Sequence, residues 1–167
     1  MTKIISTAIC KALNPSHSGA ETLMLDALDG KETLVNATKV FSSGIDGNFK
    51  EWNTDKPGIA TKEQTVDVHE LVKDATFAQM FGSLGTDLDK LCLTQAQIIN
   101  FCKKYPKWLH QDGYAIFFLF KVEDQFFVAC VFSTSYHLGA AYMFPFETIK
   151  VWPAWFSYCL VVPQLTD

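Results

Sequence analysis

The clearest candidates for catalysis lie between residues 133 and 137. His137 follows a short run of hydroxyl side chains, Ser133-Thr134-Ser135-Tyr136. A histidine can take the proton of a serine hydroxyl or a thiol and so activate it as a nucleophile, provided that the two groups are in hydrogen-bond contact. A hydrolase-like site of His137 with Ser133, Ser135 or a cysteine is therefore one hypothesis. A polar turn between two strands explains the same residues, and we favour that interpretation.

The cysteines offer a second possible nucleophile. There are five, an odd number at wide spacings, and none forms a Cys-x-x-Cys pair. Cys102 lies on an apolar helical stripe and Cys92 lies between two leucines, so burial should leave both thiols inert even with His110 nearby. Without a closely spaced pair of ligands we expect no metal site, and without a glycine-rich phosphate loop we expect no cofactor.

Charge argues against a nucleic-acid partner. The formal net charge is -4, and all 14 basic residues are lysines. Arginine, the usual side chain for bidentate recognition of phosphate and guanine, does not occur in the sequence. The sequence thus predicts a protein that does not bind nucleic acid.

The apolar runs and the cysteines indicate a compartment. The longest apolar runs, near 114–120 and 126–132, are much shorter than the roughly 20 residues of a spanning helix. Residues 4–10 are too short and too polar for a signal peptide. Free cysteines in apolar runs fit a reducing environment. We expect a cytoplasmic protein without a membrane partner.

Aromatic side chains provide the strongest hint of a binding surface. Trp152, Trp155 and Phe156 surround Pro153. Because proline is confined to the edges and bends of sheets, these rings are expected at a sheet edge, where exposed tryptophans can bind a partner or a ligand. A capped sheet edge without any ligand is the alternative.

The elements that must position these residues are expected within one domain, 1–167. We divide it into an N-terminal hairpin region (1–52), a polar surface loop or linker (53–65), a helical section (66–112) and an antiparallel sheet (113–167). In the first region, Asp29-Gly30 between two apolar runs predicts a β-hairpin, and a helix from Ser18 is the alternative.

Capping motifs predict the helices. Asp67-Val68-His69-Glu70 resembles a capping box, which places a helix start at residue 67. Phe77, Met80, Phe81 and Leu84 follow helical spacing up to Gly85. Thr94 and Gln97 form a second capping box, and the helix that follows should end near Tyr105 because Pro106 cannot donate a backbone hydrogen bond.

After Gly113 the apolar pattern changes to that of strands. Residues 114–122 and 125–133 are nearly continuous apolar runs, which predicts strands covered on both faces. Further strands are expected at 136–144, 148–152 and 156–162. The predicted fold class is α+β: amphipathic helices followed by an antiparallel β-meander of about four to five strands, with an N-terminal β-hairpin. The helix covers one face of the sheet, and the hairpin or a partner covers the other.

Several segments are similar to a family of short, uncharacterised bacterial proteins. The segments are 76–85, 91–98, 112–114, 117–120, 126–129 and 161–165, with a weaker likeness at 28–31, Phe49 and 56–58. Family members carry basic residues shortly before the closing valines, where this chain has Phe156-Ser157-Tyr158-Cys159. The resemblance implies a single domain in which the capped helix and the sheet belong together, and it implies no activity.

The leading functional hypothesis is a non-catalytic protein-interaction or small-ligand-binding module that uses the aromatic sheet edge at Trp152, Trp155 and Phe156. It depends on abundant aromatic residues and on the lack of a convincing catalytic group. The alternative is the hydrolase-like enzyme using His137. A third possibility is a homodimer that buries the aromatic edge between two copies.

Overall fold

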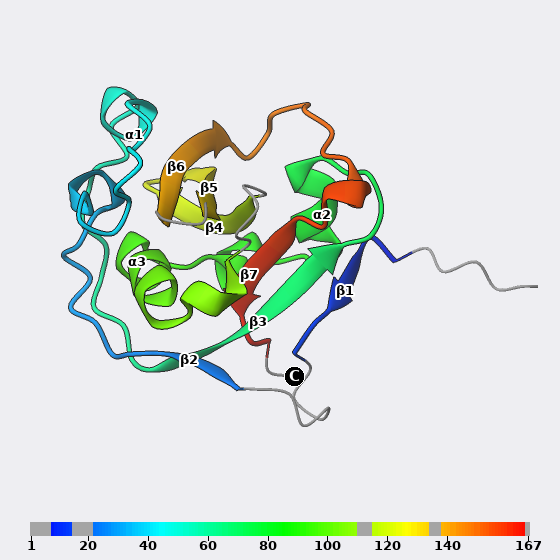
Figure 1. Ribbon diagram of the computed structural model, residues 1–167, viewed down its shortest axis with the longest axis horizontal. Coiled ribbons are helices and arrows are strands. Elements are labelled where there is room, and N and C mark those ends of the chain that lie inside the picture. The colour runs from blue at the N-terminus through cyan, green and yellow to red at the C-terminus, as the bar shows by residue number, and fades with distance from the viewer. Residues whose placement is uncertain (1–7, 15–21, 110–114, 134–137, 166–167) are drawn as a thin grey trace, which may run out of the picture.

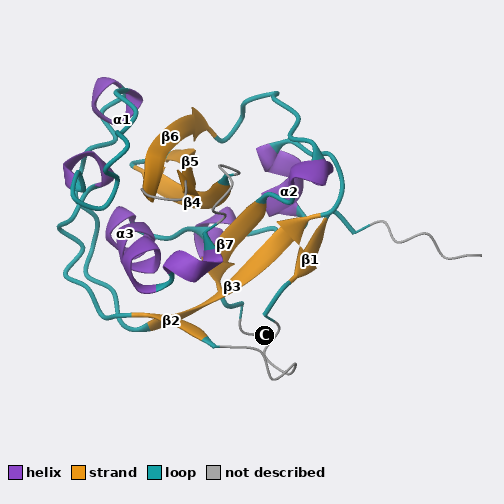
Figure 2. Ribbon diagram, viewed as in Figure 1, coloured by secondary structure: helices purple, strands orange, loops and turns teal. Residues whose placement is uncertain are grey.

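A mixed β-sheet organises the chain (Figures 1 and 2). The computed structural model describes residues 8–14, 22–109, 115–133 and 138–165. Within these ranges seven strands form the sheet, in the order β1-β3-β7-β4-β5-β6, and β2 also pairs with β3. The strands are β1 (Cys10–Ala12), β2 (Leu23–Leu25), β3 (Gln64–Leu71), β4 (Ile116–Val122), β5 (Gln125–Ser133), β6 (Leu138–Pro145) and β7 (Cys159–Pro163).

Short helices connect the strands. They are α1 (Asn48–Glu51), α2 (Phe77–Gly82), α3 (Gln95–Lys104) and the 3-10 turns η1 (Leu34–Asn36), η2 (Leu88–Leu91), η3 (Pro106–Trp108) and η4 (Ala154–Phe156). In Figure 1, α3 lies to the left of β4 and β7, and α2 lies to their right. The molecule is therefore an α+β protein whose sheet has helices on both faces.

Buried side chains on the two faces of the sheet form separate clusters. Along β4, Phe118 and Phe120 pack with α3 in one cluster, while Phe117 and Leu119 pack with α2 in the other. All four are at most 1% exposed. This confirms that these apolar runs are covered on both faces, because a strand with no polar face cannot border water.

The predicted antiparallel meander is wrong. The β4–β5 hairpin forms where it was predicted, with Val122 opposite Gln125. However, β7 enters between β3 and β4, where it runs antiparallel to β3 and parallel to β4. The sheet is consequently mixed, and strands outweigh helices. A parallel neighbour needs a long crossover, and residues 146–158 provide it.

The strand predicted at 148–152 and the helix predicted from residue 67 are also wrong. Only Trp152 in the first segment makes a β-bridge, to Ala75. Residue 67 lies inside β3, where Val66 and Val68 are buried and alternate with half-buried Asp67 and His69. This period of two, with pairing partners on both sides, prevails over a local Asp-x-x-Glu motif.

The predicted N-terminal hairpin is not formed. Gly30 does have positive φ, +80°, but the apolar runs beside it do not pair with each other. Instead β2 pairs with β3 at Leu25 and Gln64, and Leu28 bridges Thr61. The proposed helix start at Ser18 lies outside the described residues.

The capping boxes fix the start of both longer helices. In α3 the Thr94 side chain accepts from the Gln97 N–H, and Gln97 Oε1 accepts from the Thr94 N–H, as predicted. Thr76 and Gln79 form the same arrangement in α2, which we had not predicted. The helix α3 ends at Lys104, directly before the Tyr105 cap and Pro106, as expected.

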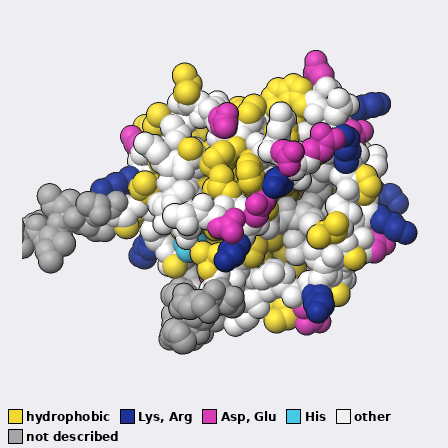
Figure 3. All heavy atoms as spheres, turned by 180° about the vertical axis from the view of Figure 1, so that it is seen from behind, with side chains coloured by type: hydrophobic (Ala, Val, Ile, Leu, Met, Phe, Trp, Pro, Cys, Tyr) yellow, Lys and Arg dark blue, Asp and Glu magenta, His cyan; other side chains and the backbone are white. Residues whose placement is uncertain are grey.

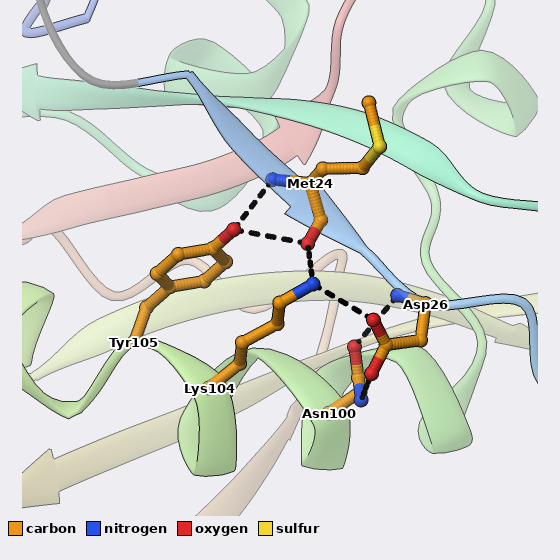
Figure 4. Close-up of polar contacts among 5 residues, drawn as sticks. All are labelled: Met24, Asp26, Asn100, Lys104 and Tyr105. Atoms are coloured by element: carbon orange, nitrogen blue, oxygen red, sulfur yellow. Dashed lines mark hydrogen bonds and ion pairs between the residues drawn. The ribbon is translucent and has the colours of Figure 1, made fainter.

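Polar contacts hold the short strand β2 against α3 (Figure 4). The Tyr105 hydroxyl accepts from the Met24 N–H at 2.8 Å and donates to the Met24 carbonyl oxygen at 3.0 Å. Asp26 accepts from Lys104 at 2.7 Å and from Asn100 at 3.0 Å. These two donors hold the pKa of the Asp26 carboxyl below its usual value. The Tyr105 hydroxyl and the Lys104–Asp26 ion pair thus provide hydrogen-bond partners for polar groups along the edge of β2.

Candidate functional site

Trp152, the centre of the predicted binding surface, belongs to the core. Its side chain is only 7% exposed, and its ring centroid lies 4.9 Å from that of Phe117, 5.3 Å from Phe77 and 5.2 Å from Tyr158. Its backbone exchanges two hydrogen bonds with Ala75, of 2.8 and 3.1 Å. Trp152 therefore holds the crossover (residues 146–158) against the face of the sheet that α2 covers, and it does not form a sheet edge.

The indole of Trp152 carries a buried donor. Its Nε1 has no hydrogen-bond partner within the described residues. A buried donor without an acceptor costs about 1–3 kcal/mol. The Lys150 Nζ lies 4.2 Å from the ring centroid, and a cation at this position stabilises the ring by about 0.5–1 kcal/mol at an exposed site. The cluster thus keeps Trp152 in place mainly by packing.

Next to Trp152, three large apolar side chains point into solvent. Ile149 is 91% exposed, Val151 is 55% exposed and Trp155 is 81% exposed. We call these three residues the 149–155 surface. Residues 149–151 are all exposed, and the segment is held to the core by Trp152, which follows directly. Figure 3 shows that hydrophobic side chains are also exposed on the face of the molecule seen from behind the view of Figure 1.

The 149–155 surface rests on a fixed support. Phe156 is half-buried and packs on Trp155 and Tyr158, with centroids 4.9 and 5.7 Å apart. The Ala154 N–H donates to Asp74 Oδ1 at 2.8 Å. Of the three predicted binding residues, Trp152 and Phe156 therefore act as supports, and Trp155 is the one with a freely accessible ring.

The predicted catalytic group is described only at Ser133. This residue ends β5, is 4% exposed and follows a register shift between Val131 and Ser133. Ser135 and His137 lie outside the described residues, as does His110. The hydrolase-like pairing therefore stays a prediction.

The thiols have little nucleophilic character. All five cysteines are free. Burial, with smaller contributions from nearby carboxylates, raises the pKa of Cys92 to about 12, and its Sγ donates to the Leu88 carbonyl oxygen at 3.4 Å. Burial also raises the pKa of Cys102 and Cys130. A thiolate is therefore scarce at neutral pH at each of these positions. In the described part of the chain, no group of three His, Cys, Asp or Glu residues is placed to hold a metal ion.

A cleft that the sequence did not reveal lies on another part of the surface. It has a volume of about 590 Å³ and is bounded by the 56–64 loop, residues 92–97 at the start of α3, and the end of β4 with Pro163 of β7. Pockets of this size hold small molecules. Its only signals in the sequence were the Thr94 capping box and the Pro57-Gly58 turn, neither of which predicts a cleft alone.

Buried hydrogen bonds hold in place the 56–64 loop, which forms one wall of this cleft. Gln95 is 5% exposed; its Oε1 accepts from the Leu34 N–H at 2.9 Å, and its Nε2 donates to the Thr54 and Lys56 carbonyl oxygens at 2.6 and 3.3 Å. Gly30 approaches so closely that a Cβ there would lie 2.1 Å from the Ile59 carbonyl oxygen. The 53–65 segment, predicted as a surface loop or linker, is thus tied to the rest of the protein and ends within β3.

Comparisons with known proteins assign no function to the chain. No protein-family model, no curated protein and no solved structure matches the chain. Among the described helices, none has the length and apolar character needed to cross a membrane. A function must therefore be inferred from surface features such as the 149–155 surface and the cleft beside α3.

Proposed function

We propose that the chain is a non-catalytic protein-interaction module that binds a partner protein through the 149–155 surface. The observation behind this proposal is that Ile149, Val151 and Trp155 are exposed at 91, 55 and 81% on a segment that Trp152 anchors in the core. A tryptophan held on a fixed support loses little conformational freedom on binding, and tryptophan is enriched among residues that dominate binding energy.

The exposures favour a protein over a small molecule as the occupant. Small-molecule sites are concave and cover most of the ligand. Side chains that are 81 and 91% exposed, such as Trp155 and Ile149, project outward and cannot line such a site. The partner must supply the groove, which is typical of an apolar pocket on another protein.

The test uses a photo-crosslinking amino acid placed singly at 155, at 149 or at 59. Ile59 is the matched control, because it is also apolar and is 76% exposed on a different part of the surface. In cells that naturally express the chain, we expect one discrete adduct from positions 155 and 149 and none from 59. Adducts of equal yield at all three positions would refute the proposal.

Light scattering coupled to size-exclusion chromatography identifies self-association. We expect the purified chain to be a monomer and Trp155→Ser to leave both its mass and its thermal stability nearly unchanged, since exposed positions alter stability by about 0.5 kcal/mol or less. A dimer that Trp155→Ser dissociates would replace the partner protein by a second copy of this chain.

A further inference from the structure

A second concave site lies where β5 begins and β6 ends. It has a volume of about 430 Å³ and is lined by Trp52, by residues 124–127 and by residues 145–147. We call it the Trp52 pocket. Phe127 lies opposite Pro145 in the strand pair, and the Phe146 N–H donates to the Phe126 carbonyl oxygen at 3.1 Å. The pairing of β5 with β6 therefore fixes one wall of a pocket whose size suits a small molecule.

Aromatic rings form much of this lining. They belong to Trp52, Phe126, Phe127 and Phe146. Trp52 is 40% exposed and Phe127 is 7% exposed, while Phe126 and Phe146 are half-buried. The face of an aromatic ring carries partial negative charge. The lining therefore favours a ligand that is apolar or positively charged.

The chain on both sides of Trp52 is held in place. Two residues after it, Thr54 is 0% exposed, and its N–H and its hydroxyl donate to the Phe49 carbonyl oxygen at 3.0 and 2.7 Å. Before α1, Asp46 Oδ2 accepts from the Met143 N–H of β6 at 3.1 Å. A fixed backbone thus presents the accessible Trp52 ring beside the strands, so that little conformational entropy is lost on binding.

The charged groups of the lining are both carboxylates. They are Asp124 and Glu147, and neither takes part in an ion pair among the described residues. An adjoining pocket, which shares Asp124, adds Lys56 and Glu123 as charged groups. Lys56 pairs with Glu123. The adjoining pocket therefore does not offset the charge of Asp124 and Glu147.

Lys121 acts on Asp124 from outside the lining. It pairs with Asp89 at 2.9 Å, and its pKa is raised chiefly by this hydrogen bond and to a smaller extent by Asp124. Even with Lys56 and Lys121 both counted, two lysines face four carboxylates, namely Asp89, Glu123, Asp124 and Glu147. This group of charges therefore has an excess of two negative charges, and its ligand must be a cation.

The chemistry of the cation can be narrowed. A metal ion needs several oxygen ligands, and no group of three His, Cys, Asp or Glu residues within the described ranges is placed to hold one. A primary ammonium is strongly hydrated, whereas a quaternary ammonium has no N–H and is bound by aromatic rings, tryptophan most of all. We infer that the Trp52 pocket binds a small quaternary ammonium compound. Its methylated head lies against Trp52 and Phe127. Asp124 and Glu147 supply the opposite charge.

Choline is a suitable probe of this site, in a ¹H–¹⁵N NMR titration of the full chain at constant ionic strength. We expect saturable shifts of the amides at 52–54, 124–127 and 146–147. Neohexyl alcohol, in which carbon replaces the ammonium nitrogen of choline, has the same shape without the charge and should bind more weakly. Ethanolamine, which lacks the methyl groups, should also bind more weakly. Equal affinity for neohexyl alcohol would overturn the cation, equal affinity for ethanolamine would overturn the quaternary assignment, and no saturation by choline would overturn the site.

Trp52→Leu removes the ring but keeps an apolar side chain. We expect it to weaken choline binding about two- to fivefold, as for a cation–π contact at an exposed site, and we expect Trp52→Phe to lose less. The double variant Asp124→Asn, Glu147→Gln should also bind more weakly. Glu32→Gln, which removes a carboxylate outside both pocket linings, is the control and should bind normally. Wild-type affinity in Trp52→Leu or in the double variant would refute the assignment, and circular dichroism checks that each variant is folded.

Discussion

Replacing Gln95 with methionine should strongly destabilise the fold, because no other side chain among the described residues satisfies the groups that Gln95 contacts. The substitution keeps an unbranched side chain but leaves the Leu34 N–H and the Thr54 carbonyl oxygen without their partner. Both residues are 0% exposed. At about 1–3 kcal/mol for each buried group left unpaired, the free energy of unfolding should fall by about 2–6 kcal/mol. That is a large part of the 5–15 kcal/mol typical of a domain.

Urea unfolding followed by far-UV circular dichroism measures this loss, with the slope of the transition compared between variants. Gln125→Met is the matched control: the same substitution at an exposed strand position should change stability by about 0.5 kcal/mol or less. If the free energy of unfolding of Gln95→Met fell by less than about 1 kcal/mol, these hydrogen bonds would not be what holds the 56–64 loop in place.

Gln95→Glu tests the same contacts through pH. The new carboxylate would face the Thr54 and Lys56 carbonyl oxygens, which raises its pKa in the folded state above the ordinary value of about 4.3. A raised folded-state pKa contributes stability below the unfolded pKa, and this contribution is lost as pH rises through the folded pKa. The deficit relative to wild type should therefore be largest at pH 7 and shrink toward pH 4. A constant deficit would show that the lost donor is not responsible.

Three further predictions concern other parts of the fold. Tyr105→Phe should accelerate hydrogen exchange at the Met24 amide and cost about 1 kcal/mol, because the hydroxyl contacts both backbone groups of Met24; unchanged exchange would contradict this role. Burial lowers the pKa of His69 below 6.5, so the unfolded chain binds the proton more readily and stability should fall as pH drops from 7 to 5. His69→Gln should reduce that fall in the urea midpoint. Gly30→Ala should lower the melting temperature far more than Gly44→Ala: both glycines have positive φ, but only at Gly30 would the new Cβ collide with backbone, and equal losses would contradict this steric account.

Sequence patterns that act within one turn or one hairpin were predicted well. The Thr94–Gln97 capping box, the end of α3 before Pro106 and the β4–β5 hairpin all form as expected. Each depends on residues that are neighbours in the chain, so their physical causes, such as a side chain that accepts a nearby N–H, are visible in the sequence alone. Buried hydrogen bonds between distant residues could not be predicted in this way. Gln95 contacts Leu34, 61 residues away, but in the sequence it looks like an ordinary helix residue.

Strand pairing was predicted poorly because it depends on distant partners. The apolar pattern of 159–163 is compatible with any neighbour, and it does not show that β7 lies between β3 and β4. The Asp29-Gly30 turn likewise shows that the chain can reverse direction there. It does not show that the segment before the turn pairs with β3 and Thr61 rather than with the segment after the turn. Of the residues in the predicted aromatic surface, Trp155 is exposed and Trp152 is buried.

The parallel pairing of β4 and β7 also accounts for the position of the cleft. Parallel strands end at the same edge of a sheet, so Val122 and Pro163 both terminate beside the cleft that they line. Since β3 is antiparallel to β7, its first residue, Gln64, lies at this edge too and brings the preceding loop with it. A meander would have separated these two ends by the intervening strands. The cleft is therefore a consequence of the pairing that the sequence did not reveal, which is why local patterns pointed only to the aromatic surface.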